Sequence, residues 1–175
     1  MTQPLTYAES ITIAATPEQV YELVTDITRT GEWSPVCKAC WWDEGDSARV
    51  GAWFTGRNET PQRTWETRSQ VVAAEEGRAF GWSVGPGRVN WTYTMREISD
   101  RVSDNAESTA GASTESTGGP LTELTETWEF TREGQAYFDV LFGSDAHAQI
   151  VQQEAAAKVG IPATLAAMKR IIEGS

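Results

Sequence analysis

One carboxyl group in this sequence is expected inside the protein, where its chemistry would differ from that of a surface acid. Glu126 lies in the segment 121–131, in which every second residue shares one face of a strand. Its neighbours on that face are Thr122, Leu124, Trp128 and Phe130. A lone carboxylate is costly to bury, so this group should be neutral or paired.

The pairing partner could come from two other predicted strands. By the same counting, Asn58 and Tyr93 lie on inward faces, and Arg57 would do so if a bulge shifted its strand by one residue. A carboxyl group with a raised pKa could transfer a proton beside a carbonyl substrate, which an aldol cyclisation followed by dehydration requires. The alternative is a structural role, in which Glu126 joins the sheet to a loop through backbone donors.

The sequence gives little support for metal or redox chemistry. Cys37 and Cys40 form the only C-x-x-C motif and His147 is the only histidine, so cysteine and histidine alone cannot complete a four-ligand zinc site. We expect structural cysteines, with redox or metal chemistry as the alternative, and a surface or capping role for His147. Phosphate loops, dinucleotide fingerprints, G-x-S-x-G and paired-histidine motifs are absent. We therefore predict no metal and no cofactor.

The elements that would position these residues begin with a strand over 7–14. A helix over 16–27 follows, with Thr16 as its N-cap, Pro17 at the first position and Gln19 at the third. A short helix over 28–33 ends before Pro35. From 36 to 130 the period is two, and turn residues divide the segment into consecutive antiparallel strands. The segment 99–120 lacks periodicity and predicts a flexible hairpin loop, with a functional lid as the alternative.

The longest helical pattern covers 144–173, with the segment 132–143 leading into it. Its expected apolar stripe consists of Val151, Ala155, Val159, Leu165, Met168 and Ile172. Pro162 lacks a backbone donor, so we expect a kink or a short break near it. A helix of this length spans about 40 Å, enough to cross a small domain. We expect the strands to wrap around it.

Length and charge limit the classes of partner. The 175 residues, 39% of them hydrophobic, fit a single domain over 1–175. No apolar run is long enough for a membrane span and the first nine residues lack a secretory pattern, so we predict a cytoplasmic protein. A formal net charge of −11 argues against nucleic acid and anionic membranes as partners. We expect a monomer or homodimer whose partner is a small molecule.

In the order of its elements and in several motifs, the chain resembles the START/Bet v 1-like (SRPBCC) superfamily, and within it the polyketide cyclase/dehydrase-like group. The matching motifs are A-T-P at 15–17, V-Y at 20–21, E-W-S-P at 32–35, V-G-A-W-F-T-G-R-N at 50–58, E-G-R-A-F-G-W at 76–82, T-E-T-W-E-F at 125–130 and G-I-P-A-T-L at 160–165. The resemblance covers nearly the whole chain except 99–120. It implies an α+β helix-grip fold, with two short helices after the first strand and a curved antiparallel sheet of about seven strands around a long C-terminal helix.

The resemblance also implies a deep apolar cavity between the sheet and the long helix. Tryptophan occurs eight times and supplies a flat apolar surface with one hydrogen-bond donor, which suits a planar or lipid-like ligand. The candidate ligand-binding residues are Phe54, Asn58, Trp65, Thr67, Ser69, Trp82, Trp91, Tyr93, Trp128 and Leu165. For each of them, ordinary packing in the core or in a strand is the alternative.

We therefore predict a protein that binds a hydrophobic or polyketide-like small molecule in an internal cavity. It could act as a cofactor-free cyclase or dehydratase in which Glu126 handles the proton. The resemblance implies that such cyclases use pocket shape and a few polar groups, without metal or organic cofactor. The alternatives are a non-catalytic carrier or sensor of a hydrophobic metabolite, and a regulatory or stress-response interaction protein with a filled cavity.

Overall fold

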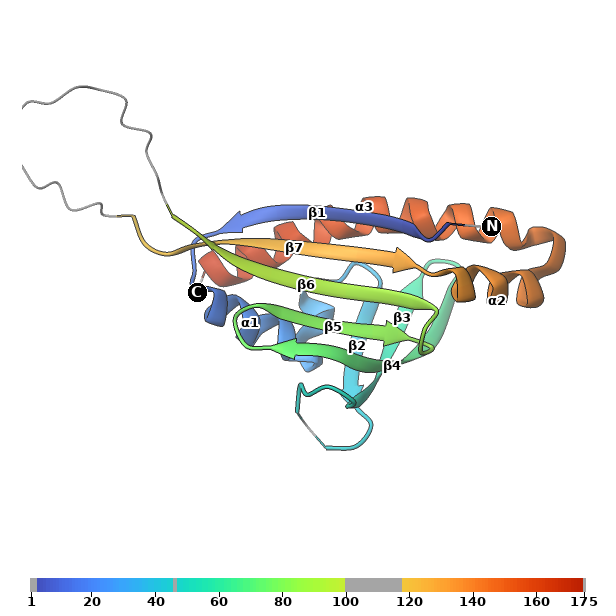
Figure 1. The fold of residues 1–175 in the computed structure, drawn as a ribbon, viewed down its shortest axis with the longest axis horizontal. Coiled ribbons are helices and arrows are strands. Elements are labelled where there is room, and N and C mark those ends of the chain that lie inside the picture. Colours follow the sequence, from blue (N-terminus) through green and yellow to red (C-terminus); the bar gives the residue numbers. More distant parts are fainter. Residues whose placement is uncertain (1–2, 46, 100–117, 175) are drawn as a thin grey trace, which may run out of the picture.

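Seven antiparallel strands form one sheet in the order β1-β7-β6-β5-β4-β3-β2 (Figure 1). The computed structural model describes residues 3–45, 47–99 and 118–174. The strands are β1 (Leu5–Ile13), β2 (Cys37–Trp42), β3 (Trp53–Thr60), β4 (Arg63–Glu75), β5 (Ala79–Val84), β6 (Val89–Ile98) and β7 (Leu121–Phe130). Strands β2 to β7 follow one another in sequence and in space, and β1 completes the sheet beside β7. This confirms the predicted helix-grip order.

The two predicted helices after β1 are present. α1 (Pro17–Thr25) begins with the expected capping box, in which Thr16 Oγ1 accepts from the Gln19 amide at 3.2 Å and the Thr16 amide donates to Gln19 Oε1 at 2.9 Å. The short 3₁₀ helix η1 (Ile27–Glu32) follows and contacts β2. Together, α1 and η1 place Trp33 shortly before β2, where its side chain is buried.

The segment that leads into the last helix is itself a helix. α2 (Arg132–Phe142) is capped by Thr131 Oγ1, which accepts from the Gly134 amide at 3.0 Å. One 3₁₀ turn, η2 (Gly143–Asp145), separates it from α3 (Ala146–Glu173). α3 runs through Pro162 as one helix of 28 residues, so of the kink or short break that we expected there, the break is absent. Such a helix measures about 40 Å.

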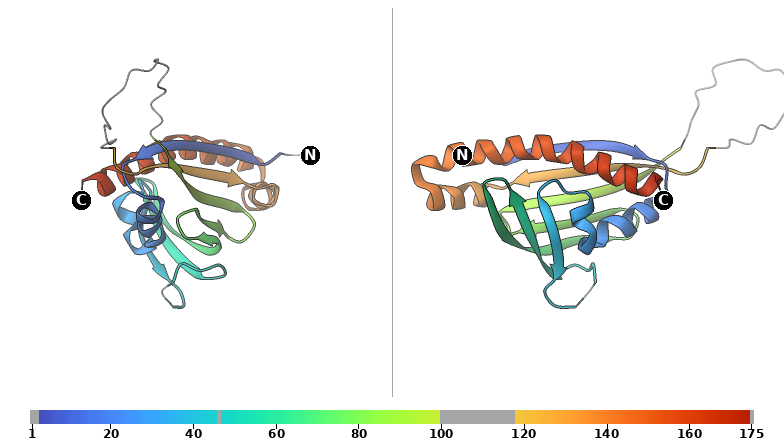
Figure 2. Two further views of the ribbon diagram at one scale, coloured as in Figure 1. Left: turned by 60° about the vertical axis from the view of Figure 1, so that its left-hand side comes forward. Right: turned by 180° about the vertical axis from the view of Figure 1, so that it is seen from behind.

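α3 crosses the sheet on its inner side, with α1 near its C-terminal end (Figure 2). It packs chiefly on β1, and its first turns lie beside α2. Two hydrogen bonds connect its C-terminal end to the end of β1 and the residue after it. Lys169 Nζ donates to the Thr12 carbonyl at 2.7 Å, and Glu173 Oε1 accepts from the Ala14 amide at 2.8 Å. None of the described helices is long and apolar enough to span a membrane.

The predicted apolar stripe of α3 is wrong in its first half. The buried residues are Ala146, Ala157, Ile161, Thr164, Leu165 and Met168. Val151 and Val159 are 50% and 75% exposed. Two residues turn an α-helix by about 200°, so Val159 lies opposite Ile161 and the prediction joined two different faces. The side that packs on the sheet is the one that starts at Ala157.

The core lies between the inner face of the sheet, α1 and the second half of α3. Its fully buried members include Ile13, Val20, Phe80, Leu124, Phe130 and Met168. Thr122 Oγ1 donates to the Ala15 carbonyl at 2.7 Å, which joins β7 to the turn before α1. The predicted flexible loop 99–120 lies, except for its ends, outside the described residues.

Candidate functional site

Glu126 is inside the protein, as the alternation in β7 predicts. Along β7, residues with even numbers are buried and residues with odd numbers are half-buried, and Glu126 is 4% exposed. In the sheet it stands between Glu9 of β1 and Tyr93 of β6. The pattern of the sequence therefore locates this carboxyl group correctly on the inner face.

Tyr93 is the partner of this carboxyl group. Its hydroxyl donates to Glu126 Oε1 at 3.2 Å, while Oε2 is buried and has no hydrogen-bond partner among the described residues. Burial raises the pKa of Glu126 to about 8, and the Tyr93 hydrogen bond opposes part of that rise. The carboxyl group is therefore mainly protonated at neutral pH, and its second oxygen can donate a hydrogen bond.

The other two proposed partners of Glu126 lie elsewhere. Asn58 is buried, but its amide donates to Thr67 Oγ1 at 3.2 Å and to the Gly56 carbonyl at 3.3 Å. Arg57 points to the surface, where its Nε lies 3.5 Å from Glu59 Oε1. The bulge in the pairing of β2 with β3 lies in β2, between Cys37 and Ala39, and leaves the inward count on β3 unchanged.

Two residues that we did not predict stand close to this pair. Burial is the main cause that raises the pKa of Tyr93, and the nearby Glu126 carboxyl and Cys37 thiol raise it further. The indole of Trp33 forms a hydrogen bond with the Tyr93 hydroxyl and lowers this pKa. Trp33 comes from the end of η1 and Cys37 from the start of β2. The motif E-W-S-P at 32–35 was the only signal in the sequence, and it does not reveal where the indole points. The resulting cluster contains Trp33, Cys37, Tyr93 and Glu126.

Aromatic rings extend from this cluster across the inner face. Trp82 of β5 contacts Phe54 of β3 at 6.0 Å, Tyr93 at 5.7 Å and Trp91 of β6 at 6.3 Å between ring centroids. Trp82 and Trp91 are nearly parallel, with 13° between their planes. Both are half-buried although they lie on the inner face, so solvent reaches this part of it. A continuous aromatic surface thus adjoins the buried carboxyl group.

The structure brings together most, but not all, of the predicted ligand-binding residues. Those that are buried are Phe54, Asn58, Ser69, Tyr93, Trp128 and Leu165, and those that are half-buried are Trp65, Thr67, Trp82 and Trp91. Trp128 stands beside Trp91 in the sheet. Trp65 lies near the start of β4, where the Arg63 guanidinium covers its ring at 4.2 Å. Leu165 approaches from α3 and belongs to the core.

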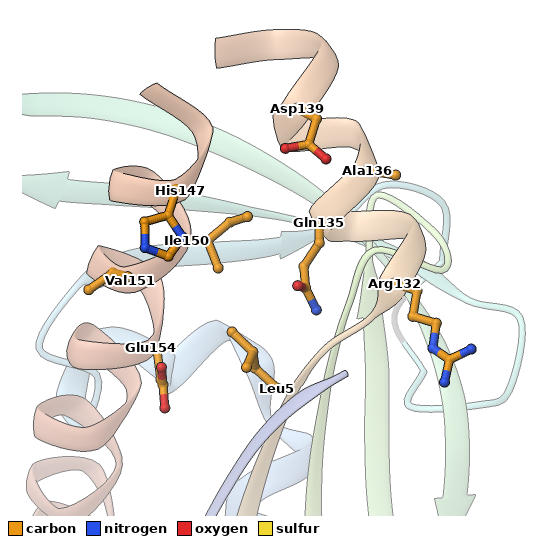
Figure 3. A pocket seen from close by; sticks show the side chains of 9 residues that line it. All are labelled: Leu5, Arg132, Gln135, Ala136, Asp139, His147, Ile150, Val151 and Glu154. Atoms are coloured by element: carbon orange, nitrogen blue, oxygen red, sulfur yellow. The ribbon is translucent and has the colours of Figure 1, made fainter. Parts of the chain in front are cut away.

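A pocket of about 550 Å³ lies away from all these residues, between α2, α3 and the start of β1 (Figure 3). Its lining residues are Leu5, Arg132, Gln135, Ala136, Asp139, His147, Ile150, Val151 and Glu154. His147 lies exposed in the first turn of α3, as predicted. Gln135 is fixed by hydrogen bonds to the Gln3 and Phe130 carbonyls at 2.9 and 3.2 Å, so it serves to hold α2 on the sheet.

Metal-ligating side chains do not gather at either place. Among the described residues, no three histidine, cysteine, aspartate or glutamate side chains form a group that could hold a metal ion. On the inner face, Glu126 and Tyr93 can form hydrogen bonds and transfer protons, and the aromatic rings can make apolar contacts.

Comparison with known proteins gives a consistent picture. A family model described as polyketide cyclase / dehydrase and lipid transport matches residues 4–173. The solution structure of a polyketide cyclase-like protein from Corynebacterium glutamicum is 50% identical, covers 99% of this chain and 94% of its own, and superposes with a TM-score of 0.64. A search of curated proteins found no match.

More distant structures share the fold. The di-domain ARO/CYC protein StfQ of the steffimycin biosynthetic pathway is 13% identical, with a TM-score of 0.61 over 98% of this chain and 51% of its own. This chain therefore spans about half of that protein's length. A protein from Nitrosomonas europaea is 11% identical, with a TM-score of 0.62 over 97% of this chain and 95% of its own. At such low identity these two likenesses concern the fold alone.

Proposed function

We propose that this chain, which belongs to the polyketide cyclase / dehydrase and lipid transport family, binds a hydrophobic small molecule that carries a carbonyl oxygen on the inner face of its sheet. The observation that carries this proposal is the carboxyl group of Glu126. It is buried, its Oε2 atom has no partner among the described residues, and it adjoins an aromatic surface that solvent reaches.

The protonation state of the carboxyl group determines which polar group of a ligand it can bind. A buried acid whose pKa is about 8 keeps its proton at neutral pH, so it offers a donor to the ligand and not a negative charge. A carbonyl oxygen is the matching acceptor. A carboxylate or phosphate ligand would be disfavoured, because its negative charge would be brought into an apolar site. The formal net charge of −11 for the whole chain favours uncharged ligands as well.

The aromatic surface favours a ligand whose remaining part is apolar and flat or extended. Trp82 and Trp91 present nearly parallel rings, on which a flat ring system or an extended acyl chain could lie. Phe54 and Tyr93 continue this surface on either side of Trp82. The name of the family, which joins polyketide cyclases with lipid transport, agrees with a ligand that is mostly apolar and has few polar groups.

A second candidate function is a cofactor-free cyclase or dehydratase, and one observation favours it. Glu126 and Tyr93 place two proton-bearing groups 3.2 Å apart beside the proposed ligand surface. In a dehydration, Glu126 would give its proton to a hydroxyl group that leaves as water. The carboxylate would then take a proton from the neighbouring carbon, which forms the double bond and restores the acid. Under the carrier or sensor alternative, the same carboxyl group only orients the ligand.

The experiment that tests ligand binding is native mass spectrometry of the protein purified from its own host, compared with the denatured sample. A reproducible additional mass that disappears on denaturation would support binding and would give the mass of the ligand. That ligand, or an apolar ketone of similar mass, would then be titrated while tryptophan fluorescence is followed. A protein without additional mass that also shows no fluorescence change with a panel of apolar ketones would contradict the proposal.

Glu126→Gln separates binding from catalysis, because glutamine keeps a donor at nearly the same position but cannot transfer a proton. Under the binding proposal, its affinity stays close to that of the wild type. Under the catalytic one, turnover is lost while affinity remains. The matched control is Glu123→Gln, which alters a carboxyl group on the opposite face of the same strand that pairs with Arg96 at 2.9 Å. That variant should keep both properties.

A further inference from the structure

The bulge in β2 turns two cysteines toward the same side. In the pairing of β2 with β3, Cys37 stands opposite Asn58, Ala39 opposite Arg57 and Cys40 opposite Gly56, so Lys38 is the extra residue. In a regular strand, residues three apart face opposite sides. The extra residue cancels this alternation. Both sulfur atoms therefore lie on the inner face, 3.2 Å apart.

The surroundings leave room for the two sulfur atoms. A Cβ atom on Gly56 would lie 3.3 Å from Cys37 Sγ and 3.3 Å from Cys40 Sγ, which is tighter than most Cβ contacts. Because Gly56 has no side chain, the two sulfur atoms can lie close to its backbone. Cys40 is 8% exposed and Cys37 is half-buried, so a small solute can approach from the Cys37 side.

The pair shares its protons unequally. The contact with Cys40 and burial raise the pKa of Cys37, whereas the contacts with Cys37 and with the Thr30 side chain lower the pKa of Cys40, although burial acts in the opposite direction. One thiol of the pair can therefore lose its proton while its neighbour keeps one, and the neighbour can then resolve an oxidised product.

We propose that Cys37 and Cys40 are a redox modification site, at which a peroxide converts the two thiols into a reversible intramolecular disulfide. The thiolate of one cysteine attacks one peroxide oxygen and breaks the O–O bond, which gives a sulfenic acid and, after protonation, one molecule of water or alcohol. The second thiol then attacks the sulfenic sulfur, its proton joins the departing hydroxyl as water, and the S–S bond forms. Two thiols are oxidised and one peroxide is reduced.

This proposal does not depend on the proposed ligand. A metal site is disfavoured at the same place, because the two thiols have no third ligand of the usual kinds among the described residues. The neighbouring side chains of Asn58 and Thr67 are hydrogen-bonded to each other, and the positive charge of Lys38 favours the ionised form of Cys37. The site is also close to Tyr93, whose pKa is raised by Cys37, so oxidation would alter the surroundings of the Tyr93 hydroxyl.

The test uses the position of Lys38 between the two cysteines. Dilute wild-type protein is treated with hydrogen peroxide, quenched, alkylated with iodoacetamide under denaturing conditions and digested with trypsin. Cleavage after Lys38 separates the peptides 30–38 and 39–49, each with one cysteine. We expect the two peptides to remain joined, lighter than their sum by two hydrogen atoms, and dithiothreitol to restore two alkylatable thiols.

Two results would overturn the proposal. One is that both cysteines stay alkylatable at peroxide concentrations that oxidise the thiol of free glutathione. The other is that neither Cys37→Ser nor Cys40→Ser forms more sulfinic acid than wild type. We expect about tenfold more sulfinic acid in the variant that keeps the attacking thiol, since it lacks the resolving thiol. A non-reducing gel distinguishes the intramolecular product from disulfides between chains, and a predominance of the latter would also contradict it.

Discussion

The hydroxyl of Tyr93 on β6 donates to Oε1 of Glu126 on β7 at a distance of 3.2 Å, and this bond joins the two strands at the centre of the inner face. Tyr93 is 4% exposed, and the pKa values of both groups are raised, mainly by burial. Such a pair is stable only while at least one of its members is neutral, because two buried negative charges would repel each other. The following predictions start from this pair and proceed to the elements around it.

Stability should depend on pH through Glu126. Its pKa is about 8 in the folded protein and ordinarily 4.5, so the folded state holds a proton that the unfolded chain releases between these two values. The stabilising contribution is complete below about pH 4.5 and is lost as pH rises to about 8, at a slope approaching about 1.4 kcal/mol per pH unit. Glu126→Gln should remove this slope. Denaturant unfolding of both proteins from pH 5 to 9 measures it.

In that experiment Glu123→Gln is the control, because Glu123 lies on the outer face and is solvated. It should keep the wild-type slope. Equal slopes in wild type and Glu126→Gln would mean that Glu126 does not hold its proton in the folded state, and that the ligand chemistry inferred from it is wrong.

Tyr93→Phe should raise the pKa of Glu126 further. The variant deletes the hydroxyl that donates to Oε1, and this hydrogen bond favours the charged form of the carboxyl group. At pH 5, where Glu126 is neutral, the loss of the hydrogen bond should cost about 1 kcal/mol of stability. Carbon-detected NMR titration of the side-chain carboxyl groups measures the pKa. Tyr137→Phe, which alters a tyrosine of α2 stacked on Arg88, should leave it unchanged, and an unchanged pKa in both variants would contradict the assigned bond.

Leu165→Ala and Val159→Ala should separate the two sides of α3. Leu165 is 2% exposed and packs in the core, so its truncation should reduce the free energy of unfolding by about 2 to 5 kcal/mol. Val159 is 75% exposed, and its truncation should change stability by less than about 0.5 kcal/mol. Chemical denaturation gives both values. Comparable losses at the two positions would place the packing side of α3 where the sequence pattern alone had put it.

Gly134→Ala should be severely destabilising, whereas Gly160→Ala should not. A Cβ atom on Gly134 would overlap the Arg88 carbonyl oxygen and lie 2.7 Å from the Phe130 ring. The Arg88 carbonyl belongs to the backbone, so it could move away only if the backbone were distorted. We expect a loss of about 3 kcal/mol or more. At Gly160, the nearest atom is Pro35 Cγ at 3.8 Å. Alanine there should stabilise α3 by about 0.5 to 1 kcal/mol. Thermal and denaturant unfolding test both, and a tolerated Gly134→Ala would exclude the close approach of α2 to Arg88, the residue before β6.

The sequence alone determined which segments form strands and, in β7, which side of the strand faces inward. The alternation in β7 placed Glu126 inside, and the turn residues separated the strands in the right order. The capping box at Thr16 identified the start of α1. These features could be predicted because a period of two and a helix cap depend on residues only a few positions apart.

The tertiary structure decided the relations between distant segments. It paired Glu126 with Tyr93 rather than with Asn58, placed Trp33 beside them, and chose the side of α3 that starts at Ala157. It also set the bulge in β2 that brings Cys37 and Cys40 together. These outcomes depend on how the sheet curves and on which surfaces meet across it. The hydrophobic pattern of a single strand or helix cannot predict them, because many strand registers and helix rotations satisfy the same pattern until the whole core is packed.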